Sequence, residues 1–290
     1  DSSWADLLSQ YNGKAITYDG IGNMLTYNGS TYTWMGRELR KITNGSNTYS
    51  YKYNADGIRT SKTVNGTTTE FFLNGSQILA QKTGDSVMRF FYDSTGKRVG
   101  FANGTMLFYY LYNLQGDVIA IVRAATGQIV AKYSYDAWGN CTVTNATGYA
   151  VGDKNPFRYR GYYYDTETGL YYLNSRYYNP EFGRFINVDS ELAGVGGNMQ
   201  GYNLFAYCFN NPVNMSDPDG NWPKWLTGAL NVLSGTLQMA AGSALGAAMG
   251  WTGFGAVAAG FLMVHGAATA TQGIGQIVNS AVGSAVLRED

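Results

Sequence analysis

Residues 157–223 read FRYRGYYYDTETGLYYLNSRYYNPEFGRFINVDSELAGVGGNMQGYNLFAYCFNNPVNMSDPDGNWP, and the rest of the chain is organised around this stretch. Before it the sequence is a loose repeat rich in Tyr and Gly. After it, from Trp225 to Leu287, there is no Asp, Glu, Lys or Arg, and Gly and Ala become frequent. We therefore expect three regions: repeats over residues 1–157, a junction over residues 158–223 and an apolar tail over residues 224–290.

The composition favours strands and tight turns. The chain has 290 residues and is 45% hydrophobic and 15% aromatic, which is enough to bury a sizeable core. Its 24 Tyr and 38 Gly are far above ordinary usage, and runs of strong helix formers are missing before the tail. The formal net charge is zero, so no global field draws the protein to a polyanion. We expect no nucleic-acid binding by the repeats.

Two cysteines and one histidine exclude several kinds of chemistry. Cys141 and Cys208 are too few for a disulfide framework. His265 alone rules out most His-dependent metal sites and Ser-His-Asp triads. We therefore expect no metal and no cofactor. No secretory leader pattern opens the chain, and Asp1 in the first position indicates a piece of a longer polypeptide.

A spaced motif recurs along the repeats, in which Tyr is followed by Asp or Asn and, four positions after the Tyr, by Gly. The Asp or Asn side chain can hydrogen-bond the backbone that follows, and Gly supplies a positive φ. Each copy therefore predicts a strand, a turn and a second strand. The copies begin at Tyr18, Tyr53, Tyr92, Tyr112 and Tyr135, and Tyr164 and Tyr178 begin copies widened by one residue.

Asn-Gly pairs between these copies predict the tips of hairpins, because a type I′ turn needs two residues with positive φ. They begin at Asn12, Asn28, Asn44, Asn65, Asn74 and Asn103. One repeat cannot bury its own aromatic face, so neighbouring hairpins must stack. The sequence therefore predicts a mainly β fold, in which antiparallel hairpins form a curved sheet and helix is confined to the tail.

The Tyr-Asp-x-x-Gly units resemble YD repeats, and the junction resembles the RHS repeat-associated core domain. That domain occurs in bacterial RHS proteins, wall-associated proteins and the C subunits of insecticidal Tc toxin complexes. The resemblance covers residues 11–221 and does not include the tail. It is carried by YRGYYYD from Tyr159, TGLYYL from Thr168, RYYNP from Arg176, GRF from Gly183, NLFAY from Asn203, NNPVN from Asn210 and DPDG from Asp217.

In that family the repeats form a spiral of β-hairpins that encloses a hollow shell, and a variable C-terminal toxin is held inside. The resemblance implies that this chain is a delivery shell that encapsulates a C-terminal effector and releases it by autoproteolysis. It also implies a cognate immunity protein and a delivery machinery as partners, and a location outside the cell or on a bacterial surface. The alternative is a surface protein whose repeats bind glycan or wall and whose junction never cuts.

The family's releasing activity is an aspartyl protease built from two D-P-x-G elements, which cuts after the second. Two carboxylates that share a proton can activate water and polarise a peptide carbonyl. The resemblance assigns these roles to Asp189 and Asp217 and places the cut between Asn221 and Trp222. Arg184 is a candidate supporting residue, because an arginine can orient or neutralise a carboxylate, although an arginine among tyrosines is more often stacked or paired in a core. Here the first element keeps only its acid, because Ser190-Glu191-Leu192 follows Asp189. Asp219 we interpret as a turn former.

The tail carries no Asp, Glu, Lys or Arg between Trp225 and Leu287. Leu and Ala recur in it at helical spacing, and Gly242, Gly246 and Gly250 would let helices approach closely. We expect two or three helices. The missing charges favour contact with a membrane, whereas several Asn and Gln favour packing inside a shell, and a pore-forming tail is a third reading.

Overall fold

The computed structural model describes residues 6–189, 203–221 and 224–225. The chain divides into two compact units, residues 1–225 and 226–290, and all described residues belong to the first. The expected helical tail, with its membrane or pore role, therefore lies outside the described residues. Within those residues, no helix has the length and apolar character needed to span a bilayer.

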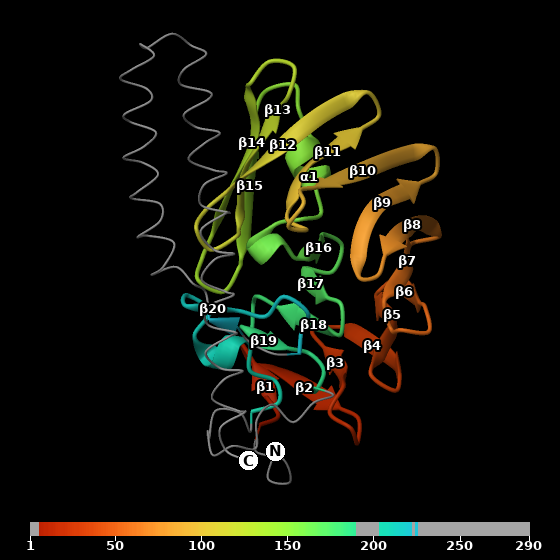
Figure 1. Ribbon diagram of the computed structural model, residues 1–290. Coiled ribbons are helices and arrows are strands. Elements are labelled where there is room, and N and C mark those ends of the chain that lie inside the picture. Colours follow the sequence, from red (N-terminus) through yellow and green to blue (C-terminus); the bar gives the residue numbers. More distant parts are fainter. Residues whose placement is uncertain (1–5, 190–202, 222–223, 226–290) are drawn as a thin grey trace, which may run out of the picture. The chain divides into compact units, whose positions relative to one another are not determined.

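One antiparallel sheet contains the motif copies from Tyr18 to Tyr135, and its strands follow one another in chain order (Figure 1). The described residues give it fifteen strands, and it is not closed, since β1 and β15 are its edges. The predicted β fold is confirmed. The strands are β1 (Gln10–Tyr11), β2 (Lys14–Tyr18), β3 (Met24–Tyr27), β4 (Ser30–Met35), β5 (Glu38–Asn44), β6 (Asn47–Tyr53), β7 (Arg59–Val64), β8 (Thr67–Asn74), β9 (Gln77–Thr83), β10 (Ser86–Tyr92), β11 (Arg98–Asn103), β12 (Met106–Tyr112), β13 (Val118–Arg123), β14 (Ile129–Tyr135) and β15 (Cys141–Asn145).

The Asn-Gly pairs all lie at hairpin turns, as predicted, but they do so in two ways. Asn12, Asn28 and Asn65 have φ of 47° to 49° and each precedes a Gly with positive φ, as in a type I′ turn. In the other three pairs the Asn is the last residue of its strand and the Gly alone begins the turn, as at Gly45 with φ 58°. The turn there is shifted by one residue from the predicted position.

The Tyr motif builds the connections between hairpins. Asp19 shows the pattern: its Oδ1 accepts hydrogen bonds from the backbone N–H of Ile21 (3.0 Å) and Asn23 (2.8 Å). The motif tyrosines reach back to the preceding hairpin, where the Tyr53 hydroxyl donates to the carbonyl of Leu39 at 2.8 Å. The same bonds recur at Asn54, Asp93, Asn113 and Asp136 for the turn and at Tyr92, Tyr112 and Tyr135 for the hydroxyl.

The junction adds a second, smaller antiparallel sheet. It contains β16 (Tyr163–Asp165), β17 (Leu170–Leu173), β18 (Arg176–Asn179) and β19 (Arg184–Phe185), and it packs against one face of the repeat sheet (Figure 1). Both sheets contribute to a single hydrophobic cluster, in which burial of each large side chain contributes about 1.5–3 kcal/mol. Its members include Leu39, Ile42, Phe71, Phe90 and Phe101 from the repeats and Tyr163, Leu170, Tyr172, Tyr177 and Ile186 from the junction.

Short helices precede the tail, so the expectation that helix is confined to the tail is wrong. These are α1 (Val151–Lys154) and the 3₁₀ helices η1 (Tyr159–Gly161) and η3 (Cys208–Asn210). Each has three or four residues, which is too short to give a helical period in the sequence. After η3, a two-residue strand β20 (Met215–Ser216) pairs with β21 (Lys224–Trp225). The chain that links these strands contains the predicted cleavage bond.

A buried ion cluster ties the repeat sheet to the junction. Arg59 of β7 binds Asp165 of β16 through two hydrogen bonds, at 2.6 and 3.2 Å. Lys62 lies 2.9 Å from Asp165 and 2.7 Å from Glu167. Burial alone would raise the pKa of Asp165, but Arg59 and Lys62 hold that pKa below its usual value. The Arg59 guanidinium is ringed by Tyr51, Phe71, Tyr163, Tyr172 and Tyr177.

Candidate cleavage site

Arg176, the first residue of β18, joins the two predicted acids. Its Nη2 lies 2.9 Å from Oδ2 of Asp189 and 3.1 Å from Oδ2 of Asp217. The Arg176 side chain is buried and lies over the ring of Phe185, 3.6 Å from the ring centre. The fold therefore brings Asp189 and Asp217 together on one guanidinium nitrogen.

Backbone contacts fix each acid in place. The N–H of Asp189 donates to the carbonyl of Leu204 at 3.3 Å. The N–H of Asp217 donates to the hydroxyl of Tyr162 at 2.9 Å, and that hydroxyl also hydrogen-bonds Tyr207 at 3.0 Å. Asp217 is fully buried, and its Oδ1 has no hydrogen-bond partner among the described residues. Asp217 is thus a buried carboxyl group with an oxygen that no hydrogen bond from the described residues occupies.

The turn after Asp217 needs Gly220. This residue has φ 76°, and a Cβ atom there would lie 2.5 Å from the carbonyl oxygen of Leu173. The carbonyl of Asp219 accepts a hydrogen bond from the Ser175 hydroxyl at 2.8 Å, and Asp219 Oδ1 accepts one from the N–H of Asn221 at 3.3 Å. These contacts agree with the interpretation of Asp219 as a turn former.

The Arg176 side chain also contacts the backbone on the N-terminal side of the predicted cut. Its Nε donates to the carbonyl of Gly220, and its Nη2 lies 3.5 Å from the carbonyl oxygen of Asn221. Trp222, on the other side of that bond, lies outside the described residues. One guanidinium therefore contacts both acids and the carbonyl that would be attacked.

The charges around Arg176 do not balance. Burial raises the pKa of Asp217 to about 6, Asp219 and Asp189 add to the rise, and Arg176 opposes it. Burial also lowers the pKa of Arg176 itself, although Asp189 and Asp217 act against that change. A single cation thus serves several carboxylates. The arrangement favours a proton on Asp217 at mildly acidic pH.

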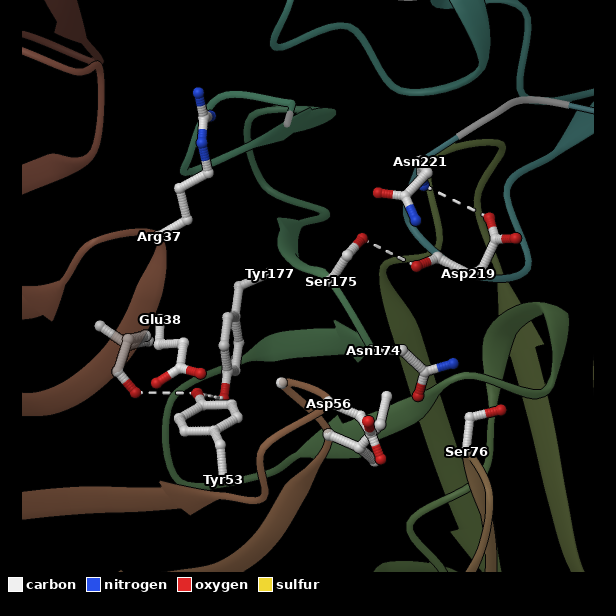
Figure 2. A pocket seen from close by; sticks show the side chains of 13 residues that line it. Arg37, Glu38, Tyr53, Asp56, Ser76, Asn174, Ser175, Tyr177, Asp219 and Asn221 are labelled. Atoms are coloured by element: carbon white, nitrogen blue, oxygen red, sulfur yellow. Dashed lines mark hydrogen bonds between the residues drawn. The ribbon is translucent and has the colours of Figure 1, made fainter. Parts of the chain in front are cut away.

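A cavity of about 310 Å³ adjoins this turn, between the repeats and the junction (Figure 2). Arg37 and Asp56 border it from turns of the repeat sheet, and Ser175, Asp219 and Asn221 border it from the junction. Figure 2 shows Ser175, Asp219 and Asn221 joined by hydrogen bonds on one side. The volume is ample for several water molecules, so water can reach the residue before the predicted cut.

Arg184, the predicted supporting residue, contacts other groups. Its Nη2 donates to the carbonyl of Asp6 at 2.9 Å and to Oδ1 of Asn203 at 3.0 Å. In the register of the small sheet Arg184 pairs with Asn179, at the opposite end of β18 from Arg176. Arg176 is therefore the arginine at the two acids, and sequence reasoning missed it because no spacing rule connects it to them. A role for Arg184 in cleavage stays a prediction.

Other reactive groups are scarce in the part of the chain that the structure describes. That part holds no group of three His, Cys, Asp or Glu residues that could bind a metal ion. Both cysteines are free, and burial raises the pKa of the Cys208 thiol to about 12. The chemistry that the described residues can support is that of two carboxylates and a guanidinium.

Comparisons with known proteins agree on the fold. A family model described as the teneurin YD-shell matches residues 81–213. The tRNA(Glu)-specific nuclease WapA of Bacillus subtilis subsp. natto is 37% identical over 282 residues, which are 94% of this chain and 12% of WapA. Toxin subunit YenC1 of Yersinia entomophaga is 29% identical over 225 residues, 67% of this chain and 22% of YenC1.

A solved structure is similar as well. The crystal structure of TcdB2-TccC3-Cdc42 matches 70% of this chain and 11% of its own chain, with a TM-score of 0.57 and 24% identity. At this identity the match shows a shared fold. This chain therefore spans a small fraction of the length of each protein that it resembles.

Proposed function

Because the chain belongs to the RHS/YD-repeat proteins, we propose that it is the part of a larger toxin that encloses a C-terminal effector and cuts itself from that effector after Asn221. Its relatives include nucleases and a toxin subunit, of which it matches only a part. The effector would follow the junction. Its activity belongs to residues beyond those described.

The observation that carries this proposal is the set of contacts made by Arg176. This buried guanidinium binds Asp189 and Asp217 and lies 3.5 Å from the carbonyl oxygen of Asn221. A purely structural arginine needs one carboxylate to balance its charge, as Arg59 shows with Asp165. A pair of acids beside a peptide carbonyl is the arrangement that aspartyl hydrolysis requires.

The geometry suggests a role for each group. Hydrolysis adds the hydroxide of water to the Asn221 carbonyl carbon and a proton to the Trp222 nitrogen. We assign the protonated acid to Asp217, because burial raises its pKa and its Oδ1 is unpartnered among the described residues. Asp189, ionised, takes the proton from water, and Arg176 stabilises the negative charge that develops on the Asn221 oxygen.

The proposed function also implies the partners of the protein and its location. The first partner is the chain's own C-terminal effector, held by the repeats until it is released. A cognate immunity protein would protect the producing cell, and a delivery machinery would carry the toxin out. The protein would then act outside the producing bacterium or on its surface, as expected for toxins that reach other cells.

Mass spectrometry of the full chain tests the cut. We expect purified wild-type protein to give a fragment that ends at Asn221 and a second that begins at Trp222. Asp189→Asn and Asp217→Asn should each slow cleavage by roughly 10²–10⁴-fold, the usual contribution of a general acid or base. Asp219→Asn is the matched comparison: it keeps an acceptor oxygen for the N–H of Asn221 and should still cleave, but its rate should fall at a lower pH, because the lost charge lowers the pKa of Asp217.

If the wild-type chain stays intact after long incubation, the proposed cleavage after Asn221 is wrong. The altered first element, Asp189-Ser190-Glu191-Leu192, would then leave the junction as a structural plug. That result would favour the alternative, a surface protein whose repeats bind glycan or wall without release. Cleavage at another bond would reject the assignment of Asn221.

A further inference from the structure

Arg37 reaches from the repeats to the backbone of Asp189. It lies in the turn between β4 and β5, and its Nη1 donates to the carbonyls of Val188 and Asp189, at 2.8 Å each. In Figure 2 its side chain extends away from Glu38 and Tyr53 and toward the junction. Asp189 is thus held by two arginines: Arg37 binds its backbone, and Arg176 binds its carboxylate.

The neighbouring contacts make this a firm attachment. The N–H of Met24, in β3, donates to the carbonyl of Ile186 at 3.0 Å. The side chain of Asn23 donates to the carbonyl of Gly36 at 2.8 Å, which holds the turn that carries Arg37. The segment from residue 186 to residue 189 is therefore attached to the repeats at both ends.

Other arginines of the repeats contact the junction away from the two acids. Arg98 donates to the carbonyl of Gly161 at 3.2 Å and lies over the ring of Phe157. Arg59 binds Asp165. Among the contacts that the described residues make, Arg37 is the arginine of the repeats that binds the backbone of a predicted catalytic acid. Its role can therefore be separated from general docking.

We propose that Arg37 is a positioning residue, through which the repeats make the junction competent to cut. The inference rests on the proposed cleavage and adds a condition to it. Asp189 takes its working position only when the turn around residues 36–37 is packed against the junction. Chain cleavage is thereby coupled to assembly of this part of the repeat sheet, so that a chain with incomplete or misdocked repeats keeps its effector attached.

Cleavage kinetics in cell-free translation test this coupling, because the full chain can be sampled as soon as it is made. Arg37→Ala should slow cleavage by about 10²-fold, the usual effect of displacing a reacting group by about 1 Å. Arg37→Lys keeps the positive charge and a donor nitrogen but loses the planar guanidinium, and it should give an intermediate rate. Arg98→Ala removes a docking arginine far from the acids, and Arg89→Ala removes an exposed one. Both should cleave much faster than Arg37→Ala.

Hydrogen exchange supplies a readout that does not depend on cleavage. In the uncut Asp217→Asn background, Arg37→Ala removes both hydrogen bonds that hold the carbonyls of Val188 and Asp189, so the Asp189 amide should exchange at least about tenfold faster. Arg98→Ala should leave that amide unchanged. The inference is overturned if Arg37→Ala cleaves at the wild-type rate with unchanged exchange, or if Arg98→Ala has equal effects. An intact wild-type chain rejects the proposed cleavage instead, and exchange alone then decides whether Arg37 orders Asp189.

Discussion

Asp165 and Asp217 are both fully buried carboxylates beside a buried arginine, yet their pKa values move in opposite directions. Asp165 receives two hydrogen bonds from Arg59 and one from Lys62, and its pKa falls. Asp217 shares the cation of Arg176 with Asp189, and its pKa rises to about 6. Both sites place a buried carboxylate against a buried guanidinium.

Charge balance is what differs. At the first site, two cations face Asp165 and Glu167, so every charge is paired. At the second, Arg176 faces Asp189 and Asp217, with Asp219 close enough to affect both partners. A cluster in which each carboxylate has its own cation stabilises the contact between the sheets. A cluster with more carboxylates than cations raises the pKa of a carboxyl group, so that this group stays protonated to a higher pH. Burial of an ion pair therefore does not by itself indicate a functional site. A buried carboxylate without its own countercharge does point to one, because its pKa is perturbed.

The largest expected effect on stability is that of Asp165→Asn. This change leaves Arg59 buried without its carboxylate, which should cost about 3–5 kcal/mol in the free energy of unfolding. Denaturant unfolding in the uncut Asp217→Asn background measures it, with the exposed Asp85→Asn as the matched control. A loss below about 1 kcal/mol would mean that the balanced site does not hold the sheets together.

The next effect is a pH dependence of stability at Asp217. Because the folded pKa lies above the unfolded value of 3.8, its contribution to stability is full below about pH 4 and is lost as pH rises through about 6. Denaturant unfolding of the uncut Asp189→Asn variant between pH 4 and pH 8 measures this loss. In that variant Arg176 faces Asp217 without the competing carboxylate of Asp189, so the loss should be smaller than the value of about 3 kcal/mol that corresponds to a rise in pKa from 3.8 to about 6. A loss of about 3 kcal/mol or more would contradict the contribution of Asp189 to the raised pKa of Asp217.

The smallest effect is that of Lys62→Gln. This change removes one of the two cations at Asp165, so the site then has more carboxylates than cations, as at Arg176. Lys62 is slightly exposed and is the second cation on Asp165, so its loss should cost about 1–2 kcal/mol near pH 7. Lys52→Gln, at an exposed position of β6, is the control. If both changes have equal effects on unfolding, the second cation does not matter to Asp165.

Most of the fold could be predicted because its determinants are local. Positive φ at Asn-Gly turns and the side-chain bonds of Asp19 and its equivalents depend on a few consecutive residues. The one-residue shift at Asn44, Asn74 and Asn103 could not be predicted, since either dipeptide register closes a hairpin. The short helices were missed because they span about one turn each.

Some residues of the candidate site could likewise be predicted from the sequence, and others could not. The two acids could be named from the junction's resemblance to a known core domain, and the structure places both on Arg176. Arg176 itself was missed in favour of Arg184, which lies closer to Asp189 in sequence. Only the pairing of β18 with its neighbours brings Arg176 beside residues 217–221, more than 40 positions later. The contact from Arg37 is equally remote in sequence, since it joins residues 152 positions apart.

The pH dependence of the cleavage rate tests the central claim most directly, since that claim is that Asp217 carries the proton used in catalysis. Measured on the freshly translated wild-type chain, the rate should be high near pH 5 and should fall as pH rises through about 6. At pH 8 it should be about 10²-fold below its maximum, because the protonated fraction of Asp217 falls tenfold per pH unit. A rate that is constant or that increases between pH 5 and pH 8 would contradict the account.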